Sequence, residues 1–337
     1  MANLESSYMG IGLKSPLIVG ACSLTSHMKA IKKIEEAGAG ALIIKSLFEE
    51  EIQLEKYKME EDIVMYDDWH AEMTDIFPDK EHAGPDEHLM WVRKTKEEVG
   101  IPVIASLNAV THDTWVEWAQ KLQDTGVDGL ELNFFATPTS FDEDAKSIED
   151  AQVEALRDVK KAVKIPVSVK LSHFYTNPLA LVKRMADTGV DGFVLFNRMF
   201  HPSFDIEKES MSFPFNLSQR NDHRLPMRFA GLLYGNIEGS ICASNGIHQA
   251  EDAVEVLLAG ADVFQVVSTL YQNSLGIIED INSGIAAWMD RKGYRTLDDF
   301  RGKLSAKHTA DKAAYRRAQY VKMLLHADDY VKRPTLI

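Results

Sequence analysis

The sequence has 337 residues, of which 45% are hydrophobic and 26% charged, as in ordinary globular proteins, and its length allows one large domain or two. The formal net charge of -14 repels phosphodiester backbones and argues against a nucleic-acid-binding protein. Two cysteines are too few for a disulfide framework or a cysteine-based metal cluster, and no membrane span is expected, so a cytoplasmic location is predicted.

Eight apolar strands are predicted in alternation with helices. A helix end, a glycine and an apolar strand recur four times, at residues 36–45, 124–133, 187–197 and 258–269. Four more strands are predicted at 16–21, 101–107, 165–171 and 239–244. Continuous apolar strands of this kind are buried on both faces, as in parallel sheets. Eight consecutive strand–helix units predict an α/β fold of the (β/α)8 TIM-barrel type, rather than the alternative of a doubly wound sheet.

One barrel domain is predicted over residues 1–306, followed by a helical extension at 307–337. Two long inserts, at about 46–87 and 198–223, each follow a strand and therefore lie at the C-terminal face of the barrel. Active sites of barrels are found on this face, so the inserts are predicted to be lids. A disordered acidic segment is the alternative for residues 46–62.

Polar residues stand where the predicted strands end: Lys45, Asn133, Lys170 and Asn197. A lysine in an apolar strand either pairs with an anion or acts as a deprotonated nucleophile, because an unpaired buried ammonium is costly. The anion would be a phosphate, a carboxylate or a reduced flavin, and the nucleophile would be that of a Schiff-base lyase. For each asparagine alone, a hydrogen-bonded position at the barrel rim is the alternative.

The last two strands predict a phosphate site. Ser244, Asn245 and Gly246 lie between a strand and a helix N-terminus, and Ser268 and Thr269 follow the next strand in the same way. Backbone N–H groups and hydroxyls at such positions bind phosphate in many barrels. A simple Asn-Gly turn and a serine helix cap are the alternatives.

Cys22 and His173 are weaker candidates. Cys22 ends the first strand and is more readily explained as a small apolar side chain than as a reactive thiol. His173 follows the fifth strand, from which it can enter the site, and no pair of the eleven histidines has metal-ligand spacing.

The order of these motifs resembles the dihydroorotate dehydrogenase family, FMN-containing barrels of pyrimidine synthesis. The similarity covers about residues 4–306 and is densest in "AGAGALIIKS", "GLELN", "PVSVKL" and "SNGIHQAEDAVEVLLAGADVFQVVST". The resemblance implies that Lys45, Asn133 and Asn197 bind the substrate and that Lys45 and Lys170 take part in catalysis. It implies an FMN site made of Ala21, Cys22, Lys45, Ser46, Asn133, Lys170, Ser244, Asn245, Gly246, Ser268 and Thr269.

The sequence departs from the family where the catalytic base is expected. In "NFFATPTS" the base position is Ala136 and a substrate-binding asparagine is replaced by Pro138. Thr137 is therefore the expected base, and Thr139 and Ser140 are the alternatives. Slow reduction by dihydroorotate, or another true substrate, is expected.

These patterns predict an FMN-dependent oxidoreductase that oxidises dihydroorotate or a related small acid. The alternatives are a Schiff-base lyase that uses Lys45 or Lys170, and a non-catalytic flavin-binding barrel. Membrane-bound members carry an N-terminal amphipathic segment, whereas this sequence is expected to start at strand one. The predicted partners are thus a soluble electron acceptor or a partner flavoprotein, with no nucleic acid and no membrane, in a homodimer.

Overall fold

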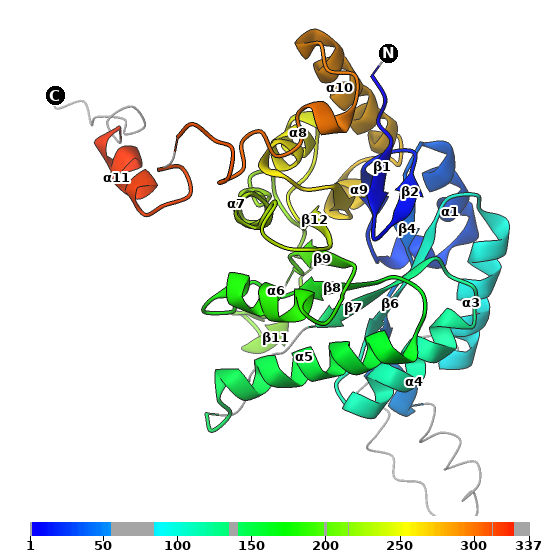
Figure 1. Cartoon of the computed structure of the whole chain (residues 1–337). Helices are drawn as coiled ribbons and strands as arrows, with labels where there is room; N and C mark the ends of the chain where they lie inside the picture. The colour runs from blue at the N-terminus through cyan, green and yellow to red at the C-terminus, as the bar shows by residue number, and fades with distance from the viewer. Residues whose placement is uncertain are drawn as a thin grey trace, which may run out of the picture.

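Eight parallel strands form a closed barrel in the computed structural model, which describes residues 2–54, 84–134, 141–198, 201–214, 216–311 and 313–326 (Figure 1). The strands are β3 (Leu17–Val19), β4 (Ala41–Ile43), β6 (Val103–Asn108), β7 (Gly129–Phe134), β8 (Val167–Leu171), β9 (Gly192–Leu195), β12 (Ser240–Ser244) and β13 (Val263–Val266). Each pairs with the next, and β13 pairs with β3 to close the barrel. The predicted (β/α)8 fold is confirmed.

Helices surround the barrel: α1 (Met28–Glu36), α3 (Pro85–Glu98), α4 (His112–Gln123), α5 (Ala145–Ala162), α6 (Pro178–Ala186), α7 (Arg224–Leu233), α8 (Ala250–Ala259), α9 (Ser268–Gln272) and α10 (Ile277–Lys292). Helix α3 begins within the last residues of the predicted insert at about 46–87. Among the described helices, none has the length and apolar composition that crossing a membrane requires.

The repeated Asp-Thr-Gly-Val-Asp-Gly segment has a defined structural role. Gly126 and Gly189 follow α4 and α6 with φ of +87° and +82°, a left-handed conformation that glycine adopts without strain. The next acid of each repeat binds the neighbouring strand: Asp128 accepts a hydrogen bond of 2.7 Å from the N–H of Val103 at the start of β6. Asp191 does the same at the start of β8, at 2.8 Å. The repeat therefore stops a helix and fixes where the adjacent strand begins.

A short hairpin closes the N-terminal end of the barrel. It consists of β1 (Ser6–Tyr8) and β2 (Ile11–Leu13), and the sequence patterns did not predict it. Tyr8 is fully buried and Met9 is 4% exposed. A Cβ atom on Gly192 would lie 3.1 Å from the Tyr8 ring, and one on Gly129 would lie 3.0 Å from the Met9 side chain. The glycines that begin β7 and β9 thus leave space for the hairpin.

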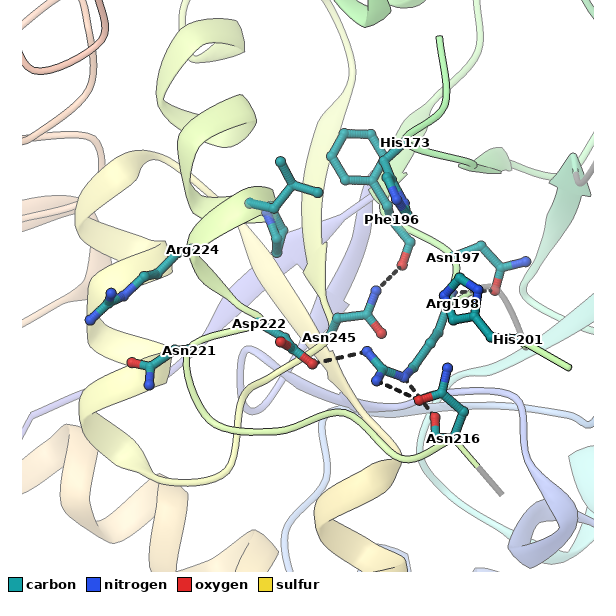
Figure 2. A pocket seen from close by; sticks show the side chains of 12 residues that line it. His173, Phe196, Asn197, Arg198, His201, Asn216, Asn221, Asp222, Arg224 and Asn245 are labelled. Atoms are coloured by element: carbon teal, nitrogen blue, oxygen red, sulfur yellow. Dashed lines mark hydrogen bonds and ion pairs between the residues drawn. The ribbon is translucent and has the colours of Figure 1, made fainter. Parts of the chain in front are cut away.

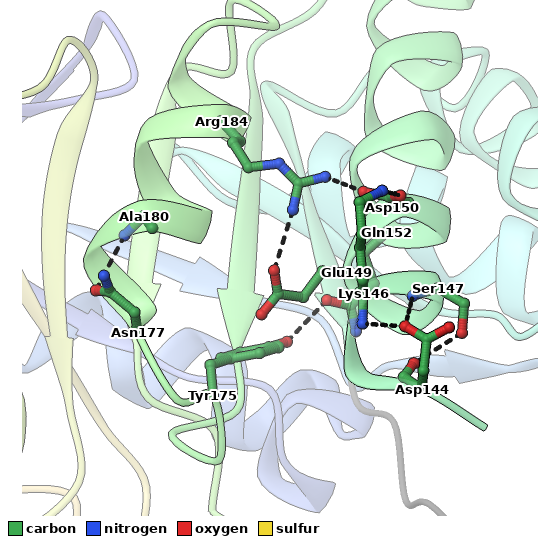
Figure 3. Close-up of polar contacts among 10 residues, drawn as sticks. All are labelled: Asp144, Lys146, Ser147, Glu149, Asp150, Gln152, Tyr175, Asn177, Ala180 and Arg184. Carbon is green, nitrogen blue, oxygen red and sulfur yellow. Dashed lines mark hydrogen bonds and ion pairs between the residues drawn. The ribbon is translucent and has the colours of Figure 1, made fainter. Parts of the chain in front are cut away.

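Helices α5 and α6 hold the loop that follows β8 (Figure 3). Asp144 caps α5 by accepting from two backbone N–H groups, and Arg184 of α6 forms an ion pair of 3.0 Å with Glu149 of α5. The Tyr175 hydroxyl donates to Gln152 of α5 at 2.8 Å. The last contact ties Tyr175, in the loop after β8 at the C-terminal face, to α5.

The two inserts and the C-terminal region contain further elements. A hairpin of β10 (Ser203–Asp205) and β11 (Ser210–Ser212) falls within the predicted lid at 198–223, and β5 (Leu47–Phe48) pairs with β6 at the start of the other insert. Residues 55–83 of that insert lie outside the described residues. Near the C-terminus, α11 (Ala318–Leu325) lies outside the ring of helices, and its Gln319 accepts from Arg228 of α7 at 3.3 Å (Figure 1).

Candidate functional site

A polar cluster lies inside the barrel, where the strands otherwise contribute apolar side chains. Glu131 of β7 is fully buried, Lys170 of β8 is 9% exposed and Gln265 of β13 is 2% exposed. The Gln265 side-chain amide donates to Glu131 at 2.5 Å, and Lys170 donates to the Gln265 carbonyl at 3.3 Å. The Lys170 ammonium lies 3.7 Å from the other carboxylate oxygen of Glu131. Lys170 therefore has the anionic partner that a buried lysine requires.

Above this cluster is a cavity of about 150 Å³ at the C-terminal ends of the strands. Its lining includes seven residues that the sequence assigned to a cofactor or substrate site: Ala21, Lys170, Asn197, Ser244, Asn245, Gly246 and Ser268. The carboxyl ends of four strands, β3, β8, β9 and β12, and the segment after β13 thus place these side chains around one space.

The loop after β12 turns sharply at the predicted phosphate site. Asn245 and Gly246 both have positive φ, +86° and +71°, a left-handed conformation that glycine and asparagine adopt more readily than other residues. A Cβ atom on Gly246 would lie 2.2 Å from the backbone nitrogen of His223, so only glycine fits beside the start of α7. Asn245 donates from its side chain to the Phe196 carbonyl at 2.7 Å, which ties this loop to β9.

The insert at 198–223 covers these groups through Ser218. The Gly246 N–H donates to the Ser218 hydroxyl at 3.2 Å, and the Ser218 N–H donates to the Ser268 hydroxyl at 2.8 Å. Both predicted anion-binding loops are therefore joined to one buried residue of the insert.

Arg198 fixes the position of this part of the insert (Figure 2). Its guanidinium donates to the Asn216 carbonyl at 2.6 Å, to the Asn216 side chain at 2.9 Å and to the Leu217 carbonyl at 3.0 Å. It also forms an ion pair of 2.9 Å with Asp222. Arg198 was not among the predicted site residues, although an arginine directly after the apolar strand that ends in Asn197 is a usable signal in the sequence.

A second cavity of about 430 Å³ adjoins the first and shares four lining residues with it: Asn197, Arg198, Asn216 and Asn245. His173, Phe196 and His201 also line it, as Figure 2 shows. Burial, followed by the nearby charge of His201, lowers the pKa of His173. The imidazole of His173 is therefore held toward its neutral form at the edge of the site.

Asn133 and Asn197 lie together at the ends of β7 and β9. Asn197 donates from its side-chain nitrogen to the side-chain oxygen of Asn133 at 2.9 Å, and the side-chain oxygen Oδ1 of Asn197 accepts from the Arg198 N–H at 2.9 Å. The two copies of the repeat thus deliver asparagines that contact each other, which fixes the orientation of both amides.

Other predicted site residues have partners elsewhere. Lys45 forms an ion pair of 3.1 Å with Glu51, and the Ser46 hydroxyl lies 2.7 Å from that of Ser106. Burial raises the pKa of the Cys22 thiol, and Thr269 is buried, with a hydroxyl that donates to the His248 carbonyl at 3.5 Å. None of these four is among the described residues that line the two cavities.

Two further observations concern the predicted chemistry. Thr137, with Ala136, Pro138, Thr139 and Ser140, lies in residues 135–140, outside the described residues. In the part of the chain that the structure describes, no three His, Cys, Asp or Glu side chains are placed to hold a metal ion.

Comparisons with known proteins agree with this arrangement. The family model described as "Dihydroorotate dehydrogenase" matches residues 81–289, well over half of the chain. The dihydroorotate dehydrogenase B (NAD(+)) catalytic subunit of Methanocaldococcus jannaschii is 27% identical over 309 residues, which cover 89% of this chain and 97% of that protein. That of Thermoplasma volcanium is 25% identical over 307 residues, with 90% and 98% covered.

A relative of a second type matches a smaller part of this chain. A putative dihydroorotate dehydrogenase A (fumarate) of Aeropyrum pernix is 28% identical over 218 residues, 62% of this chain and 69% of that protein. The match of the family model spans β6 to β13, the strands that carry most of the cavity. The chain therefore belongs to the dihydroorotate dehydrogenase family of oxidoreductases.

Proposed function

We propose that the protein is an FMN-dependent oxidoreductase that oxidises dihydroorotate or a related small acid at a CH–CH bond. The observation that carries this proposal is the cavity in which Lys170, Gly246 and Ser268 converge at the C-terminal ends of the strands. Membership of the family supports the reaction type. The cytoplasm is the proposed location.

The groups around the cavity fit FMN. The Gly246 N–H and the Ser268 hydroxyl suit a phosphate, and the absence of a Cβ at Gly246 lets the backbone approach closely. Ser218 occupies both groups, so its hydroxyl and N–H stand where the phosphate would bind. Residues 216–218 must therefore move when the cofactor binds. The proposed FMN-binding residues are Ala21, Cys22, Lys45, Ser46, Asn133, Lys170, Ser244, Asn245, Gly246, Ser268 and Thr269.

The residues of this chain have separable roles in the proposed reaction. Bound FMN supplies the hydride acceptor. Lys170 places positive charge at the floor of the cavity, where negative charge develops during the reaction. Asn133 and Asn197, held by their mutual hydrogen bond, orient the substrate together with Lys45. The segment fixed by Arg198 excludes water from above.

Thr137 is the proposed proton acceptor. Its position in the sequence, one residue after the family's base position, supports the assignment, and Thr139 and Ser140 are the alternatives. A hydroxyl removes a proton only when a neighbouring group or water takes its own proton. A slow reaction with dihydroorotate is therefore expected.

The proposed electron acceptor is a small soluble molecule or a partner flavoprotein. The relatives that cover most of the chain are named as catalytic subunits of an NAD(+)-type enzyme, which supports a partner protein here. A homodimer of the chain is also proposed.

The test begins with the absorbance spectrum of purified protein, with FMN added to any apoprotein. A yellow protein with FMN bound, bleached anaerobically by dihydroorotate or a related acid, is the expected result. A protein that stays colourless with added FMN would refute the cofactor, and bound flavin that no small acid reduces would favour a non-catalytic barrel. The Schiff-base alternative predicts a borohydride-trapped adduct, which the ion pair of Lys170 with Glu131 disfavours.

A further inference from the structure

Glu131 is a buried charged group to which the proposed reaction assigns no role. Its side chain is fully inaccessible to solvent, and one of its two carboxylate oxygens, Oε1, has no hydrogen-bond partner among the described residues. Burying a carboxylate in this way is costly unless a cation compensates it. The cation within 4 Å in the described part of the chain is Lys170, at 3.7 Å from Oε1.

Gln265 joins the two charges with a fixed orientation. A carboxylate only accepts hydrogen bonds and an ammonium only donates them. The Gln265 amide nitrogen must therefore face Glu131, at 2.5 Å, and its carbonyl oxygen must face Lys170, at 3.3 Å. Because Gln265 is 2% exposed, water does not compete for either bond. The result is a chain of three side chains contributed by β7, β13 and β8.

The geometry directs this chain toward the cavity. Glu131 is completely buried below it, whereas Lys170 and Gln265 both line it, and the Lys170 side chain is 11% exposed. A ligand in the cavity meets the ammonium first and the carboxylate behind it. In a site of low dielectric constant, a charge a few ångströms behind the ammonium reduces the positive potential that the ligand experiences.

We propose that Glu131 is a positioning residue that holds Lys170 through Gln265 and partly offsets its positive charge at the cavity. The pairing of the three side chains stands on the structure alone, whereas its effect on a flavin rests on the proposed function. Two experiments therefore separate the pairing from the cofactor.

The first experiment measures the thermal midpoint of the protein as purified, by circular dichroism, for Lys170→Met, Glu131→Gln and the double variant. Lys170→Met leaves the carboxylate buried without its cation, and it is expected to lower the midpoint by about 5 °C or more. Adding Glu131→Gln removes that charge and is expected to restore most of the loss. If Lys170→Met does not fold but the double variant does, the rescue by Glu131→Gln is complete and supports the pairing more strongly. Losses that simply add, or a double variant less stable than Lys170→Met, overturn the pairing.

The second experiment measures the reduction potential of FMN-loaded protein against a reference dye. Glu131→Gln leaves Lys170 unopposed, and the equilibrium constant for flavin reduction is expected to rise at least tenfold, about 30 mV for two electrons. Glu131→Asp keeps the charge and is expected to stay within threefold of wild type. Glu154→Gln, which removes an exposed carboxylate of α5, is the control for overall charge.

The outcomes separate the two claims. An unchanged potential in FMN-loaded Glu131→Gln overturns the effect of Glu131 on the site while leaving the proposed function intact. Failure of wild-type protein to bind FMN overturns the proposed function, and the stability measurement then still decides whether Glu131 and Lys170 form a pair.

Discussion

At the level of single residues, proton transfer in the proposed reaction depends on Thr137. Thr137→Val is expected to lower the rate of flavin reduction by the substrate about a hundredfold, the usual scale for removing a positioned base. Anaerobic stopped-flow absorbance measures this rate, with Thr139→Val and Ser140→Ala as matched controls that retain most of it. Undiminished reduction in Thr137→Val would assign the proton transfer to another group.

Some residues of the site were predictable from the sequence and others were not. Lys170 and Asn197 were predicted because each interrupts or follows an apolar strand, and both line the cavity. Glu131 interrupts the apolar strand of "GLELN" in the same way, two residues before Asn133, and a buried carboxylate needs a partner as much as a buried ammonium does. Its partner Lys170 and the role of Gln265 could not be predicted, because only the closed barrel brings these side chains from β7, β8 and β13 together.

The second prediction concerns His88 on α3. Burial, followed by the positive charge of Lys45, lowers the pKa of His88 to about 4, and its Nε2 atom is buried with no partner among the described residues. The unfolded chain therefore binds a proton near pH 6.5 that the folded protein does not bind until about pH 4. Stability is lost as pH falls through this window, by up to about 1.36 kcal/mol per pH unit.

Replacing His88 removes this contribution. In His88→Leu, urea unfolding at pH 7 and at pH 5 is expected to differ by less than in wild type, because the unfolded state no longer gains that proton. An identical difference in both proteins would show that His88 does not carry the effect.

At the level of elements, periodicity predicted the strands of the barrel but not the segments that pack against its ends. The strands of the N-terminal hairpin have three residues each, too few to show alternation, and their burial depends on Gly129 and Gly192, far away in the sequence. The contacts of Ser218 with Gly246 and Ser268 were equally out of reach, because an irregular insert has no period from which its packing can be read. Arg198 is the residue that gives this insert a fixed position.

The third prediction follows from that role. Arg198→Ala removes an ion pair and the hydrogen bonds that hold Asn216 and Leu217, so the insert loses its fixed position over the cavity. The rate at which bound FMN dissociates, measured by the recovery of flavin fluorescence after dilution, is expected to rise at least tenfold, because the segment over the cavity then opens more often. Arg220→Ala is the matched control, since Arg220 is exposed and makes one long contact of 3.4 Å with Asp252. Equal dissociation rates in Arg198→Ala and wild type would contradict this role.

At the level of the whole molecule, the fold was predictable because the repeat itself encodes it. The left-handed glycine, the aspartate that binds the neighbouring strand and the glycine that makes room for the hairpin occur in both full copies of the repeat. Each copy of the repeat therefore specifies where a strand begins and where the N-terminal hairpin packs against that strand. The repeat contains no information about the two inserts, and the structure of these inserts determines how the site is covered.

The fourth prediction concerns assembly. Light scattering during gel filtration is expected to give twice the 37.8 kDa mass of one chain, because twofold homo-oligomers are the commonest assemblies and the family resemblance implies one. A monomer mass at micromolar concentration would contradict it.

The hairpin at the N-terminal end also determines how the interior exchanges with its surroundings. Tyr8 and Met9 fill that end, so among the described residues the opening toward solvent lies at the opposite face, where residues 216–218 line the cavity. Any bound molecule then leaves no faster than that segment opens, so its residence time is set by the motion of the segment as well as by the strength of binding. Cys242 is fully buried in the barrel interior beside the hairpin, so its thiol becomes accessible from the N-terminal end only when the hairpin opens. Its modification by a thiol reagent measures how often the hairpin end opens.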